Sequence, residues 1–283
     1  MTVAEADRPS VAGRPGAELA LRVGSAVVLA PLAIGVAYIG GWPFALFWGA
    51  AAIGVLWEWT SLVAEGDRRS VLMAGAVSLA LALALAQTHH LVAAIIVLAM
   101  GTLAAAALAP AERRIWAACG IPYAGAIGLA PIVLRSDERG FLVIMLLFAI
   151  VWATDIAAYF AGRALGGPKL MPRVSPKKTW SGALAGTVAA ILVAVAIAKS
   201  AGLAGLVAIA IMAILLSVVA QAGDLFESAL KRRFGAKDSG HLIPGHGGLM
   251  DRLDGFVAAA FLAALIGLLR GGFEAPGRGL LVW

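Results

Sequence analysis

Cysteine is almost absent from this sequence, because Cys119 is the only one among 283 residues. A single cysteine excludes an intramolecular disulfide and a zinc site built from several thiolates. Charged residues are scarce as well, at 13%. The sequence also lacks the motifs G-x-x-x-x-G-K-[ST], G-x-G-x-x-G and H-E-x-x-H. These absences argue against a P-loop ATPase, a Rossmann enzyme and a zinc metalloprotease.

Apolar residues are what the sequence has in excess: 61% are hydrophobic, and the mean hydropathy is +0.93. Such values are typical of an all-α polytopic integral membrane protein. A bilayer is crossed by about 20 apolar residues in a helix. About nine segments meet that requirement, namely 19–39, 43–63, 71–87, 91–109, 115–134, 140–162, 183–199, 203–223 and 255–270.

The loops between these segments divide the chain and orient it. Residues 1–18 are polar and are expected to form a disordered arm. The N-terminal membrane helices occupy 19–139. A catalytic membrane region is expected over 140–270, with polar loops at 163–182 and 223–254, followed by a tail at 271–283. Of the 22 basic residues, 17 fall on the side of the N-terminus and of both polar loops. This bias predicts a multi-pass protein of the cell (inner or plasma) membrane, with those loops in the cytoplasm. It also accounts for the net charge of +6 without a nucleic-acid partner.

Two acidic residues fall within apolar segments, where a carboxylate is costly unless it faces protein or water. Asp155 shares a helix face with Tyr159 and is a candidate functional residue, or else a structural hydrogen-bond partner. Glu58 stands between two tryptophans, and it either lies at the interface or belongs to a functional or packing network. The tryptophans around it favour an interfacial aromatic belt (Trp42, Trp48, Trp57 and Trp59).

The segment Ser-Pro-Lys-Lys-Thr, residues 175–179, predicts the start of a helix, with Ser175 at the N-cap and proline at the first helical position. Lys177 and Lys178 would then lie in the first turn, where the helix dipole is already positive. An anion bound there would explain the two lysines, so the segment predicts a phosphate site. The alternative is that the lysines only anchor the topology.

Residues 223–254 concentrate charge between two apolar segments. Asp224, Glu227, Ser228 and Lys231 recur at helical spacing and are expected to share one face. Asp251 and Asp254 share a face at the beginning of the next helix. Because one helix leaves the membrane where the next enters, these carboxylates can converge. Several carboxylates beside lysine and arginine suit Mg²⁺ and phosphate groups.

The same residues carry a family resemblance. From Ser228 to Asp254 the chain resembles, over 27 residues with fixed spacing, the signature of the phosphatidate cytidylyltransferase (CDP-diacylglycerol synthase) family. Its central part reads Lys-Asp-Ser-Gly, two residues, then Ile-Pro-Gly-His-Gly-Gly-Leu-Met-Asp-Arg-Leu-Asp. The segments around Asp155 and Ser-Pro-Lys-Lys-Thr look like an upstream block of that family. One departure is Ser181, where the family usually has glutamate; the intact main signature favours that glutamate being dispensable.

The resemblance implies the reaction CTP + phosphatidate → CDP-diacylglycerol + pyrophosphate. It makes Asp224 and Asp251 the Mg²⁺ ligands, and it leaves open a second, monovalent cation. The catalytic candidates are Asp224, Asp251, Asp254, Lys237 and Arg252. The substrate-binding candidates are Asp155, Ser175, Lys177, Lys178, Thr179, Ser228, Lys231, Arg232, His246, Gly247 and Gly248.

Three other functions compete with this one. A polyprenol kinase would also use CTP, but it would transfer the γ-phosphate to an alcohol. An ion-coupled transporter would place acids at mid-membrane, whereas most charges here gather at one side. A CDP-alcohol phosphotransferase would need D-G-x-x-A-R, which is absent. The expected partners are CTP, phosphatidate and membrane lipids, and a homodimer is left open.

Overall fold

The computed structural model describes residues 15–63, 68–240 and 247–283. It confirms a polytopic helical membrane protein, because eight helices in the described ranges are long and apolar enough to cross a bilayer. Another helix, α1, precedes them and is apolar from Val27 to Ile39. The helices are α1 (Pro15–Ile39), α2 (Gly41–Val63), α3 (Arg68–Gln87), α4 (Leu91–Leu108), α5 (Arg114–Arg135), α6 (Gly140–Leu165), α7 (Trp180–Ser200), α8 (Leu206–Arg233), α9 (Met250–Gly271) and the short α10 (Pro276–Leu281).

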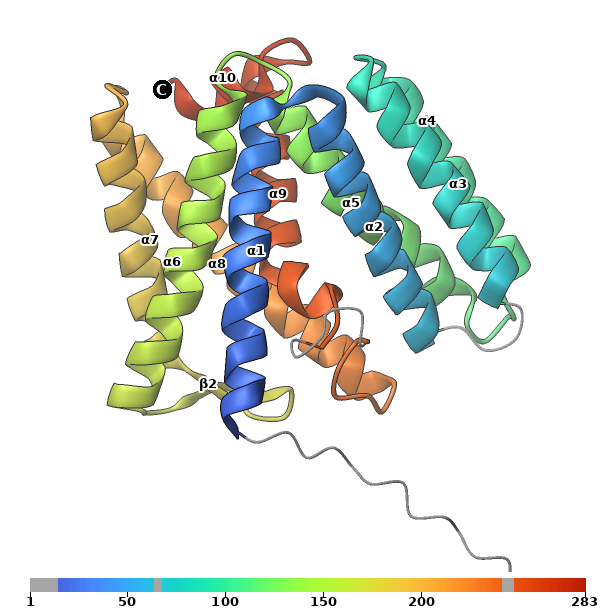
Figure 1. Cartoon of the computed structure of the whole chain (residues 1–283), viewed down its shortest axis with the longest axis horizontal. Helices are drawn as coiled ribbons and strands as arrows, with labels where there is room; N and C mark the ends of the chain where they lie inside the picture. Colours follow the sequence, from blue (N-terminus) through green and yellow to red (C-terminus); the bar gives the residue numbers. More distant parts are fainter. Residues whose placement is uncertain (1–14, 64–67, 241–246) are drawn as a thin grey trace, which may run out of the picture.

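The long helices form two groups, and α9 joins them. Helices α2 to α5 pack on one another, and α6 to α8 pack on one another. Helix α9 contacts α8 on one side and α5 on the other, and it lies behind α1 in Figure 1. Consequently the beginning of α9 meets residues from both halves of the chain. The short α10, within the predicted tail, packs against α9 at the opposite end from β2.

Residues 169–179 form the exception to the helical fold among the described residues. Strand β1 (Lys169–Met171) pairs antiparallel with β2 (Ser175–Thr179). The predicted helix start at Ser175 is therefore wrong, and so is the placement of two lysines in a first helical turn. The helix begins at Trp180, with Thr179 as its N-cap: the Thr179 hydroxyl accepts a hydrogen bond from the Gly182 amide at 3.2 Å. Serine followed by proline fits a strand entering a hairpin as well as a helix start.

Glycines allow the close helix contacts that position this region. A Cβ on Gly182 would lie 2.6 Å from the Ala158 carbonyl oxygen, and one on Gly186 would lie 2.7 Å from that of Thr154. Helices α6 and α7 therefore approach with backbone against backbone, as small residues permit in membranes. The hairpin between them is held at the base of this tight pair.

Two of the four tryptophans of α2 belong to the core and not to an aromatic belt. Trp48 and Trp59 are 2% and 1% exposed, whereas Trp42 and Trp57 are exposed. Trp48 stacks on Phe256 of α9, with ring centroids 4.8 Å apart. The belt prediction is thus wrong for the buried pair, because spacing along one helix does not show which face meets another helix. The stack fixes α2 against α9.

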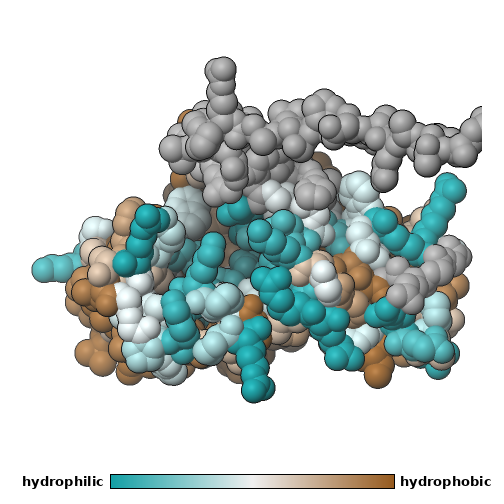
Figure 2. Space-filling view, turned by 90° about the horizontal axis from the view of Figure 1, so that it is seen from below, coloured by the Kyte–Doolittle hydropathy of each residue, from teal (hydrophilic) through white to brown (hydrophobic). Residues whose placement is uncertain are grey.

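Hydrophilic side chains gather at the end of the molecule that carries the hairpin (Figure 2). We call this the polar end: it comprises the β1–β2 hairpin, residues 109–113 and residues 234–240 and 247–249, together with the adjoining helix termini. The connections predicted to lie on the side of the membrane with more basic residues are found here, as far as they are described. The fold therefore brings the two polar loops of the catalytic region to the same end.

Candidate active site

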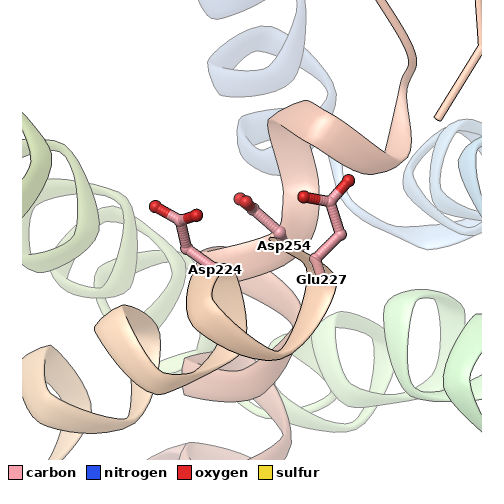
Figure 3. Close-up of side chains that lie close together, drawn as sticks. All are labelled: Asp224, Glu227 and Asp254. Carbon is pink, nitrogen blue, oxygen red and sulfur yellow. The ribbon is translucent and has the colours of Figure 1, made fainter. Parts of the chain in front are cut away.

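Three carboxylates come together at the polar end. Asp224 and Glu227 lie three residues apart on α8, and Asp254 lies in the second turn of α9. One oxygen of each lies within 4.8 Å of the others. The three side chains point to the same side of the α8–α9 contact (Figure 3). Glu227 is buried, and the two aspartates are half-buried.

The close approach of two helix backbones makes this group possible. A Cβ on Gly223 would lie 2.5 Å from the Asp254 carbonyl oxygen and 2.8 Å from Ala258 Cβ. Only glycine at position 223, one residue before Asp224, allows the backbone of α9 to come this close to α8. The three-carboxylate group thus depends on the sequence Gly-Asp and on the packing of α8 against α9.

Two lysines neutralise part of this negative charge. Lys178, from β2, forms an ion pair with Asp224. Lys231, one turn after Glu227 on α8, has its ammonium 2.8 Å from Glu227 Oε2 and also pairs with Asp251 Oδ1. Carboxylates this close repel one another, so cations beside them are required for all three to stay ionised. The hairpin lysine and the helical lysine supply them from two sides.

Asp251 stands beside the three carboxylates but is not one of the group. Its Oδ1 faces Lys231, and its Oδ2 accepts hydrogen bonds from the Ser239 amide at 3.1 Å, the Ser239 hydroxyl at 2.8 Å and the Gly248 amide at 2.9 Å. Both oxygens therefore have protein partners. In this structure Asp251 orders the polar end through Lys231 and the turn before α9.

The three-carboxylate group fits a hard divalent cation. Carboxylate oxygens are the ligands that Mg²⁺ takes from proteins. One of them, Glu227 Oε1, is buried and has no hydrogen-bond partner among the described residues. A buried, partnerless carboxylate oxygen is costly unless a cation or a proton satisfies it. The donor set and this oxygen together favour a metal site between α8 and α9.

Comparison with known proteins decides the family. Residues 20–269 match the cytidylyltransferase family. The chain belongs to the cytidylyltransferase family. It is 44% identical over 253 residues to a phosphatidate cytidylyltransferase of Brucella suis, covering 89% of this chain and 94% of that protein. It has the same identity and coverage with the phosphatidate cytidylyltransferase of Brucella melitensis. With that of Rickettsia typhi it is 42% identical over 136 residues, which are 46% of this chain and 60% of the other.

The resemblance read from the sequence is thereby confirmed, and the other residues of the cytidylyltransferase signature can be placed. Ser228 donates a hydrogen bond to Asp224 at 3.4 Å. Asp155 of α6 is exposed, within electrostatic range of Asp224 and Lys178. The Arg232 guanidinium donates to the Ala236 carbonyl at 3.3 Å. Three other basic candidates are exposed: Lys177, Lys237 and Arg252.

The remaining candidates shape the backbone or lie elsewhere. Ser175 is half-buried in β2, and Thr179 caps α7. Gly247 adopts φ +81°, a left-handed conformation that favours glycine, and Gly248 is buried beside Asp251. His246 lies outside the described residues.

Ser181, the departure from the family pattern, has a structural role here. Its hydroxyl donates to the Gly166 carbonyl oxygen and lies 3.0 Å from the Thr179 hydroxyl. These contacts join the end of α6 to the N-cap of α7, at the base of the hairpin. At this position a short hydroxyl side chain holds the hairpin, whereas a glutamate would add a charge.

Glu58 is the residue whose place the sequence left open. It is 3% exposed, and its carboxylate accepts hydrogen bonds from the amides of Leu249 and Met250 at 2.8 and 2.7 Å and from the Ser239 hydroxyl at 3.2 Å. Glu58 therefore belongs to a network at the polar end. The signal available in the sequence was the charge within an apolar segment, but not its partners.

Proposed function

We propose that this protein is a phosphatidate cytidylyltransferase, which converts CTP and phosphatidate to CDP-diacylglycerol and pyrophosphate at the three-carboxylate group. Family membership and relatives that are 44% identical over nearly their whole length support the activity. The observation that carries the location is the meeting of Asp224, Glu227 and Asp254 between two lysines. Nucleotidyl transfer needs this combination of acids and cations.

The reaction requires little covalent catalysis by the protein. A phosphate oxygen of phosphatidate attacks the α-phosphorus of CTP, and the bond from that phosphorus to the bridging oxygen of the β-phosphate breaks. The nucleophile is already ionised at neutral pH, so no general base has to remove a proton. What the chain must supply is orientation and charge neutralisation for two anionic substrates.

Mg²⁺ would be held by Asp224, Glu227 and Asp254, and when bound it would neutralise phosphate oxygens and the departing pyrophosphate. The resemblance names Asp251 beside Asp224. In this structure Lys231 occupies one oxygen of Asp251, so that pair can share an ion only if Lys231 leaves Asp251. Lys231 would leave it by pairing with a phosphate group of the substrate. Both ligand sets contain Asp224.

Different basic residues would bind different parts of the two substrates. Lys178 and Lys231 adjoin the carboxylates directly and are suited to the phosphates nearest the metal. The remaining basic candidates lie on the exposed surface of the polar end, where CTP enters from water (Lys177, Arg232, Lys237 and Arg252). Phosphatidate, by contrast, would arrive laterally from the bilayer with its acyl chains in lipid.

We place the polar end in the cytoplasm, where CTP is made available to the enzyme. The support is the distribution of basic residues, 17 of 22 on that side, which cytoplasmic loops accumulate. The protein would then act in the cell membrane and deliver CDP-diacylglycerol to the inner leaflet.

The test is an assay of the purified protein with CTP, phosphatidate and Mg²⁺. The proposal predicts equal amounts of CDP-diacylglycerol and pyrophosphate. A lipid kinase would instead release CDP and phosphorylate an alcohol such as a polyprenol. Absence of CDP-diacylglycerol from folded protein, at any Mg²⁺ concentration, would contradict the proposal.

A further inference from the structure

Glu58 lies on α2, far in sequence from the signature region, yet it contacts three residues of that region. It accepts hydrogen bonds from the amides of Leu249 and Met250 and from the hydroxyl of Ser239. The side chain is 3% exposed. In each contact an N–H or O–H group donates to the carboxylate. A carboxylate has two acceptor oxygens and no proton, so it can accept all three hydrogen bonds.

The two amides belong to the beginning of α9. The first N–H groups of a helix have no partners within the helix and need an acceptor from outside. Leu249, the N-cap residue of α9, makes no side-chain cap of its own. Glu58 therefore caps α9 from another helix, and its negative charge lies at the positive end of the α9 dipole.

The same turn also holds Asp251. The Ser239 hydroxyl lies 2.8 Å from Asp251 Oδ2 and 3.2 Å from Glu58 Oε2, so it shares its single proton between the two carboxylates and links them. A Cβ on Gly248 would overlap Ser239 Oγ and would lie 2.8 Å from Glu58 Oε2. The contact leaves no room for a side chain at position 248. Glu58, Ser239 and Asp251 thus form one clamp around the turn that precedes α9, and we call it the Glu58 clamp.

We propose that Glu58 is a positioning residue for nucleotidyl transfer. Its carboxylate holds the turn and the start of α9 so that Asp251 meets Lys231 and Asp254 meets Asp224 and Glu227. The residue acts through these contacts and not by touching substrate. This inference rests on the proposed function, because it gives a role in that reaction to a residue of the N-terminal helices.

Substitution of Glu58 by glutamine tests the clamp with almost no change in size. In glutamine an NH2 group replaces one of the two carboxylate oxygens. A donor would then face an N–H or O–H group that itself donates. Loss of a hydrogen bond to a charged group is expected to lower kcat about tenfold to a hundredfold. The Mg²⁺ concentration for half-maximal rate should rise as well, because Asp254 is no longer held in place. A purely structural role would lower the yield of folded protein without moving the Mg²⁺ dependence of each folded molecule.

Glu112→Gln is the matched control, because Glu112 is an exposed glutamate at the same end of the molecule. It should keep the wild-type kcat and Mg²⁺ dependence. Ser239→Ala removes the hydroxyl that contacts both carboxylates of the clamp. It should give a smaller loss in kcat than Glu58→Gln, because the two amide contacts of Glu58 remain. The double variant Glu58→Gln/Ser239→Ala should lose less than the product of the two single losses, because the residues share a hydrogen bond. Strict multiplication of the two effects would contradict the clamp.

A cysteine probe gives a readout that needs no activity. Met250 is buried at the beginning of α9 and its amide donates to Glu58, so Met250→Cys in a Cys119→Ala background reports opening of the clamp. When Glu58→Gln is added, the thiol at position 250 should react severalfold faster with a water-soluble maleimide, without substrates. If Glu58→Gln does not fold, Glu58→Asp and Ser239→Ala provide the same comparison. Unchanged labelling together with wild-type kcat and Mg²⁺ dependence would overturn the inference. A wild-type protein inactive toward phosphatidate would instead overturn the proposed function, and the labelling would still test the clamp.

Discussion

Lys178 of β2 forms an ion pair with Asp224 of α8. This contact joins the Ser-Pro-Lys-Lys-Thr segment to the carboxylate shared by both candidate metal sets. It also changes the explanation for why a lysine is found at position 178. The sequence predicted Lys178 at a helix N-terminus, as part of a phosphate site or as a topological anchor, whereas the structure gives it a partner on another element. The hairpin brings a cation to the acids before any substrate binds.

Lys178→Gln should lower kcat/KM about ten- to a hundredfold, because a charge-assisted contact to phosphate is lost. Stability should change little. The side chains of Lys178 and Asp224 are 25% and 35% exposed, and pairs open to water contribute at most about 1 kcal/mol. Steady-state kinetics and thermal unfolding in detergent measure the two effects. Lys169→Gln, an exposed lysine of β1, is the control and should leave both unchanged. Full activity of Lys178→Gln per folded molecule would remove Lys178 from the site.

Mg²⁺ alone should stabilise the protein if the three carboxylates hold it. Binding to the folded state adds about 2.7 kcal/mol when the ion is present at about 100 times its Kd. The unfolding temperature of the wild type should therefore rise with Mg²⁺. Asp224→Asn should abolish that rise, and Glu227→Gln and Asp254→Asn should weaken it. Asp251→Asn separates the two ligand sets: a normal rise in this variant would keep Asp251 out of the metal site of the substrate-free protein.

Gly223→Ala should damage the site without removing any charge. The added Cβ would lie 2.5 Å from the Asp254 carbonyl oxygen, so α8 and α9 have to separate. Overpacking of this kind costs about 1–3 kcal/mol, and the separation should weaken Mg²⁺ stabilisation as well. Gly35→Ala is the control, because a Cβ there would meet nothing within 4 Å. Equal unfolding temperatures and equal Mg²⁺ responses in the two variants would contradict the close-packing account.

Cysteine labelling tests the orientation. Asp238→Cys in a Cys119→Ala background should react with an impermeant maleimide in inverted vesicles and not in intact cells. Asp238 is the suitable position because it is exposed, whereas its neighbour Ser239 is buried in the Glu58 clamp. Reaction from outside intact cells would place the polar end outside, where CTP is not supplied.

The membrane helices could be predicted from the sequence because the length of an apolar run reports directly on crossing a bilayer. For example, the predicted segments 91–109 and 140–162 correspond to the helices Leu91–Leu108 and Gly140–Leu165. The convergence of acids from α8 and α9 could also be predicted, because those helices meet at one interface.

Contacts between distant segments could not be predicted. Nothing in the local pattern around Ser175 separates a strand from a helix start, and the spacing of tryptophans does not show that Trp48 stacks on Phe256. Glu58 was visible as an unusual charge, but its partners lie about 180 to 190 residues away in the sequence. Likewise, the packing of α8 on α9 was needed to show that Glu227 and Asp254, and not Asp251, form the group with Asp224.

Transfer of label from CTP to lipid shows directly whether the protein performs cytidylyl transfer at the three-carboxylate group. CTP labelled at the α-phosphate and CTP labelled at the γ-phosphate are incubated separately with phosphatidate, Mg²⁺ and either wild-type protein or Asp224→Asn. Wild-type protein should move the α-label into the lipid product and leave the γ-label in pyrophosphate. Folded Asp224→Asn should transfer neither label. Movement of the γ-label into lipid, or wild-type rates in Asp224→Asn, would contradict cytidylyl transfer at this site.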